Sequence, residues 1–569
     1  MKNLEVSAIF REMAKIFQIK GDNPFRIRAY ERAALNIEGL PEDIENFVKE
    51  NRLTEIPGIG KDLSRKTEEI VTTGKCRAYE ELKKTIPEGL LDLLNIPGVG
   101  PKTTKLLFEK LKIKNIADLE GAIQKGKLKG VFGIKEKTIE NIQKGIELVR
   151  RGKERMTLGQ AIQLADEFVG ALEKLPEAKL VSLAGSLRRR KETIRDIDIL
   201  VISNKPRKIM AAFTGLPSVK EVLAKGETKA AVRTDDDAQV DCRVLEEKSF
   251  GAALLYFTGS KNFNIKIRQL GIKNGFKINE YGVFKNGKFI AGKTEEEIFK
   301  LLRMPYIEPE LREDAGEVEL AQKNRLPRLI ELKDIKGDLH VHSKWSDGGN
   351  SIEEMAEACQ KRGYAYAALT DHSQGLKVAG GLTLADLKKK KSEIDKLNKR
   401  LKNFKVLYGT EVDIASDGRL DYKDEVLKGF DLVVAAVHTG FKQSEAQITR
   451  RLISACRNKY VHIIAHPTGR LWGTRDAYKI DFDEVFKAAR DTNTHFEINA
   501  FPQRLDLNGQ NCRRAKEIGV KLAVNTDAHA AEQLSAIALG VSVARRGWLS
   551  KEDVINTLPL GALLKALKK

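Results

Sequence analysis

The sequence predicts a multidomain chain of α and α/β domains that ends in a distorted (β/α)7 barrel. Three observations carry this prediction. Short amphipathic helices separated by glycine turns fill residues 1–150, and a strand with paired aspartates follows near residue 196. The last third alternates apolar strands, loops and helices. A length of 569 residues fits roughly three to five domains.

Composition narrows the classes of function. The formal net charge of +20 favours a polyanionic partner such as nucleic acid. Five cysteines without CxxC spacing are typical of a reducing compartment and exclude a disulfide framework. No signal peptide or long apolar run is visible, so we expect a cytoplasmic monomer with no membrane partner. All eight histidines lie between His340 and His529, which indicates a second chemistry confined to the C-terminal part.

An internal repeat marks the helical region. LTEIPGIGKDLSRKTEEI at 53–70 and LLNIPGVGPKTTKLLFEKL at 93–111 each read as a helix, a tight I-P-G-x-G turn and a second helix. Glycines let the backbone approach a phosphate, and the free amides of the second helix bind it. This is the helix-hairpin-helix pattern, which grips a nucleic-acid backbone without reading its sequence. The expected DNA contacts are Gly58, Gly60, Gly98 and Gly100.

The central strand carries the first catalytic candidates. In RDIDILV, Asp196 and Asp198 share one strand face, because alternate side chains point to opposite faces. Asp241, in AQVDCRV, lies on the polar face of a second strand. Three acids from two strands suit a two-metal nucleotidyl-transfer site. A solvated cluster of Arg and Asp side chains would be the better interpretation of D-x-D alone.

The full pattern, GS-x-RR followed by D-x-D and a lone Asp on a later strand, resembles the palm of family X DNA polymerases. The resemblance implies that Gly185, Ser186 and Arg189 bind the triphosphate and that the three aspartates bind metal. Arg190 and Arg195 stand where the family has glycine, which leaves their effect on nucleotide binding open.

The stretch from Ser249 to Gly282 is similar to the thumb of the same family. By that resemblance the turn Tyr256, Phe257 and Gly259 lines the sugar pocket, where the family excludes a 2′-hydroxyl. Asn264 would reach the incoming base and Arg268 the template. Lys261 lies where a base would stack.

DNPFRIRAYERAA and the first hairpin resemble the family's small N-terminal domain, in which some members carry a Schiff-base lysine. Lys66 stands at the matching position, a possible lyase nucleophile. Arg26 fits the family's basic positions, but Asp62 stands where a lysine is expected, so a solvated helix lysine is the favoured interpretation.

In the last third, seven apolar strands are predicted, and most end on a histidine or an acid. Ligands at the carboxyl ends of successive parallel strands are how a β/α barrel builds its site. The candidate ligands are His340, His342, Asp347, His372, Glu411, His438, His466, Asp527 and His529. This set resembles the PHP (polymerase and histidinol phosphatase) domain, whose members hydrolyse phosphate esters with metal-activated hydroxide. His462 and His495 fall outside the pattern and are expected to be structural, whereas Arg470 and Arg504 are possible phosphate contacts.

The resemblance covers nearly the whole chain. It implies the following division: 1–85 an N-terminal helical, lyase-like DNA-binding domain, 86–152 a fingers-type helix-hairpin-helix domain, 153–244 a nucleotidyltransferase palm, 245–305 a thumb, 306–335 a linker and 336–569 a PHP domain. The implied function is template-directed filling of short gaps in DNA repair, using dNTPs, with gapped or nicked DNA as partner.

The implied cofactors are Mg²⁺ at the polymerase site, which Mn²⁺ can replace, and two or three Mn²⁺, Zn²⁺ or Fe ions in the PHP domain. The second site would act as a 3′–5′ exonuclease, an abasic-site endonuclease or a 3′-phosphatase. Two alternatives stay open: a PHP domain that is only a DNA-binding scaffold, and a template-independent nucleotidyltransferase.

Overall fold

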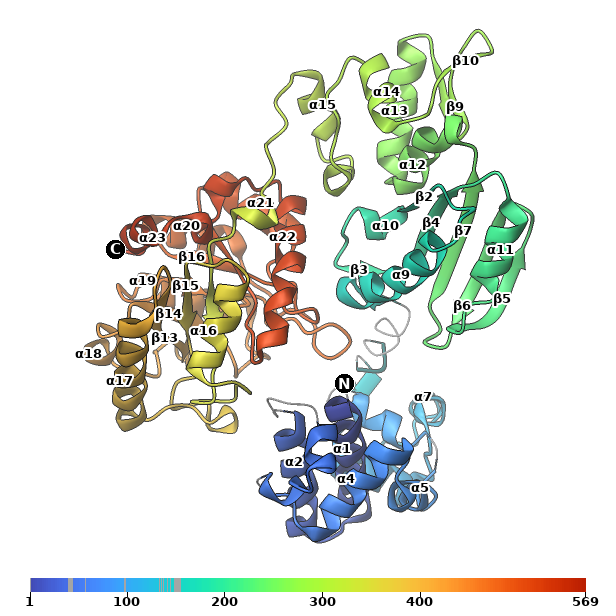
Figure 1. Ribbon diagram of the computed structural model, residues 1–569. Coiled ribbons are helices and arrows are strands. Elements are labelled where there is room, and N and C mark those ends of the chain that lie inside the picture. The colour runs from blue at the N-terminus through green and yellow to red at the C-terminus, as the bar shows by residue number, and fades with distance from the viewer. Residues whose placement is uncertain are drawn as a thin grey trace.

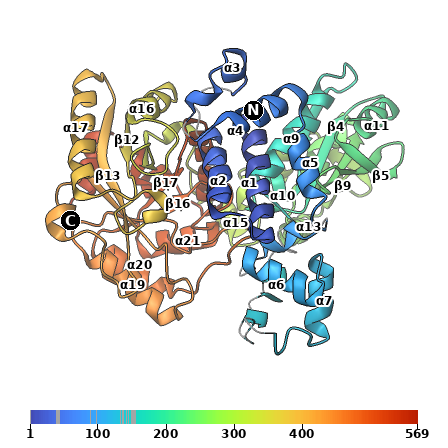
Figure 2. The ribbon, with the colours of Figure 1, turned by 90° about the horizontal axis from the view of Figure 1, so that it is seen from below.

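The computed structural model describes residues 2–38, 44–56, 58–87, 89–96, 99–131, 134, 136, 138–140, 142–143, 145–147 and 155–569. Three parts follow one another along the chain: N-terminal helices, a central region built on a five-stranded sheet, and a barrel (Figure 1). The barrel and the five-stranded sheet lie on opposite sides of the molecule in both views, with α1 and α2 below them in Figure 1 and between them in projection in Figure 2. No described helix is long and apolar enough to cross a membrane.

The N-terminal part is helical, as predicted. Val6, Phe10, Tyr30 and Ile37 belong to its first hydrophobic core, and a second core surrounds Leu107. Its helices are α1 (Lys2–Lys20), α2 (Pro24–Glu38), α3 (Ile44–Lys49), α4 (Lys61–Thr73), α5 (Arg77–Lys83), α6 (Pro101–Leu111) and α7 (Ile116–Gln124).

The two hairpin turns precede α4 and α6. Gly58 has a φ of 81°, a left-handed conformation that favours glycine. Gly60 and Gly100 are the N-cap residues of α4 and α6, and neither has a side-chain cap, so the first amides of both helices stay available. Gly98 lies outside the described residues.

The central sheet has the order β2-β4-β7-β6-β5, in which only β4 and β7 run parallel. Ile197, Ile199 and Val201 on one face of β4 belong to the same core as Phe168 of α9 and Phe213 of α11. The elements are α9 (Leu158–Glu173), β2 (Leu180–Leu183), α10 (Gly185–Arg188), β4 (Asp196–Ile202), α11 (Pro206–Thr214), β5 (Val219–Lys225), β6 (Lys229–Thr234) and β7 (Gln239–Leu245), with the small pair β1 (Met156–Thr157) and β3 (Thr193–Ile194) beside them.

A smaller α/β unit follows. Its core includes Leu255, Phe263, Val283 and Phe299. Its elements are α12 (Phe250–Thr258), α13 (Lys261–Lys273), β8 (Lys277–Asn279), β9 (Gly282–Lys285), β10 (Lys288–Ala291) and α14 (Glu295–Leu301), after which α15 (Glu317–Gln322) belongs to the connection to the barrel.

The C-terminal part is a near-closed barrel of seven parallel strands in sequence order, which confirms the predicted (β/α)7 architecture. A parallel bridge between Val341 and Ala528 joins the first and last strands. The strands are β11 (Gly337–Val341), β12 (Tyr366–Leu369), β13 (Lys405–Asp413), β14 (Leu432–Ala436), β15 (Ile463–Ile464), β16 (His495–Asn499) and β17 (Leu522–Asn525).

Helices cover the barrel, and several begin at the capping boxes that their sequences contain, for example at Ser351, Thr383 and Ser444. They are α16 (Ile352–Lys361), α17 (Leu384–Arg400), α18 (Asp424–Leu427), α19 (Glu445–Arg457), α20 (Phe482–Asp491), α21 (Gly509–Ile518), α22 (Ile537–Arg546) and α23 (Leu560–Ala566).

A buried ion network joins the central sheet, the smaller unit and the connection. The Glu295 side chain is 3% exposed and accepts hydrogen bonds from Arg188, Arg312 and Tyr306. Burial alone would raise the pKa of this carboxyl, but the two guanidinium groups outweigh it and lower the pKa to about 2. Because the pair of arginines is itself buried, removing the carboxylate would leave unpaired cations.

We expect Glu295→Ala to cost about 3–5 kcal/mol of unfolding free energy, the usual result of breaking a buried ion pair from one side. Because the folded pKa is depressed, the contribution is present above the unfolded pKa of about 4.3 and is lost as the pH falls toward 2. Calorimetry at pH 7 and at pH 3 measures both effects. Glu296→Ala, an exposed acid on the same helix, is the matched control and should change stability by less than about 0.5 kcal/mol.

Candidate active sites on the two sheets

The first site is a face of the central sheet that carries all three predicted aspartates. Asp198 on β4 lies directly opposite Asp241 on β7, and Asp196 is opposite Gln239. Burial and repulsion from the two neighbouring aspartates raise the pKa of Asp198 to about 7. Carboxylates in this state favour a bound cation, which would relieve the repulsion.

Gly185 closes over this face. Its φ is 63°, and a Cβ atom there would overlap a carboxylate oxygen of Asp198. The Ala184 amide donates to the Asp198 carbonyl at 2.9 Å, which ties the start of α10 to β4. Ser186 follows and is half-buried. The glycine therefore lets the backbone of α10 lie against the carboxylates, as a phosphate-binding turn requires.

The double arginine makes protein contacts. Arg188 pairs with Glu295, and Arg189 donates from Nε to Glu313 at 3.0 Å and from Nη1 to the Thr258 carbonyl. Arg189 is 9% exposed, so this conformation does not present its guanidinium to solvent. Arg190 and Arg195, at the two departures from the family pattern, are half-buried and exposed respectively.

The predicted base and sugar contacts lie around one depression on the smaller unit. Tyr256, Asn264 and Arg268 line it together with residues of α12 and β8. Asn264 donates to the Tyr256 carbonyl at 2.6 Å, and Tyr256 stands edge-on to Phe257 with ring centroids 5.1 Å apart. Lys261 begins α13 and is exposed, and Ser260 caps the helix by accepting from Phe263 N.

Gly259 links this unit to the first site. A Cβ atom on Gly259 would come 3.1 Å from Nη1 of Arg189, so the glycine leaves room for the arginine side chain. The three aspartates, the start of α10 and the residues after Tyr256 therefore share one region of the chain's surface.

The favoured interpretation of Lys66 as a solvated helix lysine is wrong. The residue is 7% exposed and its Nζ pairs with Asp62, with the Tyr30 ring 5.8 Å away. Burial would lower its pKa, but the hydrogen bond to Asp62 and the nearby Tyr30 hydroxyl outweigh burial and raise it. Asp62, the departure from the family pattern, therefore keeps the amine protonated, whereas a Schiff-base nucleophile needs a neutral amine.

The second site lies at the carboxyl end of the barrel, where Glu411 of β13 is surrounded by histidines. Its two oxygens lie 2.8–3.6 Å from ring nitrogens of five of them: His340, His342, His372, His438 and His466. Asp527 lies 3.1 Å from His342 and 3.4 Å from His340, and Asp347 lies 3.4 Å from His529 and 3.6 Å from His372. All nine predicted ligands are thus brought together.

These distances test whether metal ions fit. Two ligand atoms about 2.1 Å from one tetrahedral ion lie about 3.4 Å apart, close to most of the separations observed. Three sets of ligand atoms converge within 4.8 Å of one another: His342, Asp347, His372 and His529; His340, His342 and Asp527; His372, Glu411 and His438. Buried ring nitrogens of His340 and His342 have no hydrogen-bond partner, as expected of metal ligands. The cluster fits two or three ions.

The pKa shifts within the cluster also support metal binding. Burial would lower the pKa of His372, but Glu411 and Asp347 outweigh it and raise the pKa to about 10. Burial and the neighbouring imidazoles lower the pKa of His342 to about 4. Such divergent pKa values in one cavity arise when charged ligands are packed together.

Sequence reasoning missed the residues that hold the ligands in place. Glu497 is fully buried and accepts at 2.7 Å from His340 Nδ1, which leaves Nε2 directed at Glu411. Asn499 donates at 3.0 Å to both Glu497 and Asp527. Asp413 lies 3.4 Å from the Nδ1 atom of His438. The signal was present: Glu497 and Asn499 occupy alternate positions of the strand HFEIN.

The remaining candidate residues have different surroundings. The His462 ring accepts from the Val433 amide at 2.9 Å, and His495 is buried, with a pKa that burial lowers to about 4. Arg470 donates to the backbone carbonyl oxygens of Arg504 and Leu505, which is a structural role. Arg504 itself points toward the cluster, 3.7 Å from Asp527, and its buried Nη1 has no hydrogen-bond partner.

Four family models match successive parts of the chain. The family models that match are the helix-hairpin-helix domain over residues 1–76, the SAM-like helix-hairpin-helix tandem over 90–147, the DNA polymerase beta thumb over 253–313 and the PHP domain over 338–501.

Relatives match the whole chain or parts of it. The DNA polymerase/3'-5' exonuclease PolX of Bacillus subtilis (strain 168) is 41% identical over 573 residues and covers 100% of both chains. A probable phosphatase of Thermoanaerobacter sp. (strain X514) is 31% identical over 41% of this chain and 94% of its own. DNA polymerase lambda of Rattus norvegicus is 24% identical over 55% of this chain and 56% of its own. With the full-length match and the two centres described above, this chain belongs to the family X DNA polymerases that carry a C-terminal PHP domain.

Proposed function

We propose that this protein fills short gaps in DNA during repair by template-directed synthesis, with Mg²⁺, replaceable by Mn²⁺, at the aspartate site. The observation that carries the proposal is the pairing of Asp198 with Asp241 beneath Gly185, where three carboxylates and a backbone turn meet. Gapped or nicked DNA and dNTPs are the substrates. The proposal extends to the division of the chain into five domains and a linker that the sequence predicts.

Each group has a role in this reaction. Asp196 and Asp198 would be ligands of both metal ions. Asp241 would be a further ligand of the ion that activates the primer 3′-hydroxyl. Bound magnesium would lower the pKa of that hydroxyl and neutralise the triphosphate. The backbone of α10 and Ser186 would orient the phosphates, and Asn264 and Arg268 would align the base pair. For Arg189 to bind phosphate, its guanidinium would exchange Glu313 for the nucleotide.

We further propose that the barrel hydrolyses phosphodiesters at DNA 3′ ends, with two or three Mn²⁺, Zn²⁺ or Fe ions held by the nine ligands. The full-length relative from Bacillus subtilis is named a 3'-5' exonuclease. This favours exonuclease over abasic-site endonuclease or 3′-phosphatase activity. Bound ions would supply a hydroxide nucleophile at neutral pH. Glu497 keeps His340 in one tautomer, and Arg504 would receive the phosphate with its unpartnered Nη1.

The rival functions are less favoured. A scaffold without catalysis would not need nine converging ligands with buried second partners such as Glu497. A template-independent transferase would not need two helix-hairpin-helix motifs. It would also not need Asn264 and Arg268, the predicted contacts to the base pair. Lyase chemistry at Lys66 is not proposed, because Asp62 raises the pKa of that amine.

Independence of the two sites is the first expectation. Asp198→Asn should reduce dNTP incorporation at least about 100-fold, since it removes charge where magnesium must bind. It should leave the trimming of 3′ ends unchanged, and His342→Ala should do the reverse. Both reactions are followed on one labelled one-nucleotide gap, with Asp236→Asn, an exposed acid of the same sheet region, as control. Normal trimming by His342→Ala would favour the scaffold.

Metal binding in the barrel should release protons. The pKa of His372 is about 10, so its ring is protonated at pH 7.5 before an ion binds, and a ligating imidazole must be neutral. Affinity for Mn²⁺ should therefore rise between pH 6.5 and 8.5, by up to about tenfold per unit for each proton displaced. Calorimetry in buffers of different ionisation enthalpy counts these protons. A pH-independent affinity would show that His372 is not a ligand.

Grip on the DNA backbone is tested at the hairpin. Gly58→Val should weaken binding of gapped duplexes of any sequence by a similar factor and flatten the dependence of Kd on salt, because fewer counterions are released. Gly74→Val is the matched control: Gly74 has a similar φ of 70° but caps the end of α4. Equal losses in both variants would assign the effect to backbone strain and not to lost phosphate contacts.

A further inference from the structure

The smaller α/β unit contains a three-stranded sheet in the order β10-β9-β8, and only one face of this sheet packs on the unit's core. Side chains on the inner face are buried in the unit's core: Ile278, Val283 and Ala291. Strand pairing sets Lys277 opposite Phe284 and Phe284 opposite Phe289, so these three side chains share the outer face. Two aromatic rings of this sheet are thus turned away from the core.

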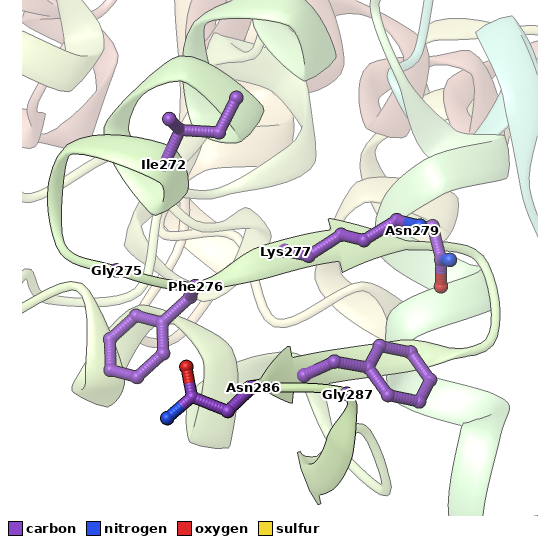
Figure 3. A pocket seen from close by; sticks show the side chains of 8 residues that line it. Ile272, Gly275, Phe276, Lys277, Asn279, Asn286 and Gly287 are labelled. Carbon is purple, nitrogen blue, oxygen red and sulfur yellow. The ribbon is translucent and has the colours of Figure 1, made fainter.

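A pocket of about 420 Å³ lies beside this outer face (Figure 3), within the usual range of ligand sites, about 300–1,000 Å³. Its walls are mainly apolar and amide side chains: Ile272, Phe276, Asn279, Phe284 and Asn286, with Lys277 at the edge. Ile272 is 72% exposed, an unusual position for an isoleucine at the end of a helix. Phe289 braces Phe284 edge-on, with centroids 5.8 Å apart.

The charge around the pocket is one-sided. Residues 261–293 contain eight Lys and Arg side chains and a single acid, Glu280. Lys277, Lys285 and Lys288 are exposed, and within the described part of the chain they make no ion pair. Lys285 Nζ lies 5.9 Å from the centroid of the Phe276 ring. Aromatic rings among unpaired lysines match nucleic acid, whose bases stack and whose phosphates need cations.

The pocket continues toward the polymerase site. Asn279 lines both this pocket and the smaller depression formed with Tyr256, Asn264 and Arg268. A strand that passes the predicted template contact Arg268 could therefore continue over Asn279 onto the outer face. That continuity favours nucleic acid over a protein segment as the occupant.

We propose that the pocket and the outer face beside it bind the single-stranded template beyond the base being copied. Bases would stack on Phe284 of the outer face and on Phe276 of the pocket wall. Phosphates would lie near Lys277 and near Lys285 and Lys288, a pair that flanks the Asn286–Gly287 turn at the edge of the pocket. The direction of the strand rests on the proposed function, whereas the stacking itself does not. Stacking tolerates any base, so the face adds affinity without sequence preference. The substrate class implied is DNA with an extended single-stranded template, in longer gaps and at recessed ends.

The test compares two labelled primer–templates that differ only in a single-stranded template extension of about ten nucleotides, within the range of known single-strand sites. Fluorescence anisotropy gives Kd for the full-length protein. Phe284→Ala and Phe276→Ala should each weaken binding of the extended DNA by at least about fivefold and leave the blunt DNA unchanged. Leu332→Ala, at a 50% exposed leucine outside this unit, is the control and should have no effect.

Three further variants keep the result decisive. Phe284→Trp should restore binding because it keeps an aromatic face, and Phe284→Leu should not. The exposed pair Lys285→Gln with Lys288→Gln should lower the salt dependence for the extended DNA only. If Leu replaces Phe284 without loss, aromatic stacking does not hold the DNA and the proposal is wrong. It is also wrong if both DNAs lose affinity equally, or if neither does.

Failure of this proposal is distinguishable from failure of the proposed function. Incorporation opposite a one-nucleotide gap depends on the aspartates and not on the outer face. It should therefore stay normal in Phe284→Ala even though the extended DNA binds weakly.

Discussion

The burial of carboxylates on parallel strands is the constraint on which both active centres depend, because desolvation penalises their charged form. Asp198 and Asp241 lie directly opposite each other, and burial together with repulsion from Asp196 and Asp241 raises the pKa of Asp198 to about 7. The barrel meets the same difficulty by surrounding Glu411 with histidines, which can share protons with it. The central sheet has no such neighbours within the aspartate face, so divalent ions are the natural compensation there. The two sites thus balance their buried carboxylates with different neighbouring groups.

Buried ion pairs also join different parts of the chain. Glu295 holds Arg188 and Arg312, and Glu313 lies 3.0 Å from Arg189 and 3.1 Å from Arg546 of α22. Such pairs add little net stability but are costly to break from one side. Because Arg546 belongs to a helix of the barrel part and Arg189 follows α10 beside the first site, Glu313 links the barrel part to the central sheet region.

The amino-acid sequence by itself determined the classes of element and the set of candidate metal ligands. Alternation in IDILV placed Asp196 and Asp198 on one face, since side-chain direction on a strand has a period of two. Strand ends carrying His340, Glu411 and Asp527 predicted the barrel and its cluster, because parallel strands deliver their carboxyl ends to one rim. These inferences succeed because they depend on local periodicity and on the type of residue.

Only the tertiary structure decided the roles that depend on contacts between distant segments. The spacing of Glu497 and Asn499 on HFEIN indicates only a shared strand face, and the role of Glu497 comes from its contact with His340, 157 residues away. Arg189 turned out to face Glu313, and Lys66 to be buried against Tyr30 and paired with Asp62. The pKa and the availability of a charged group are set by its neighbours in space and by its desolvation, and neither quantity can be read from the sequence along one strand or helix.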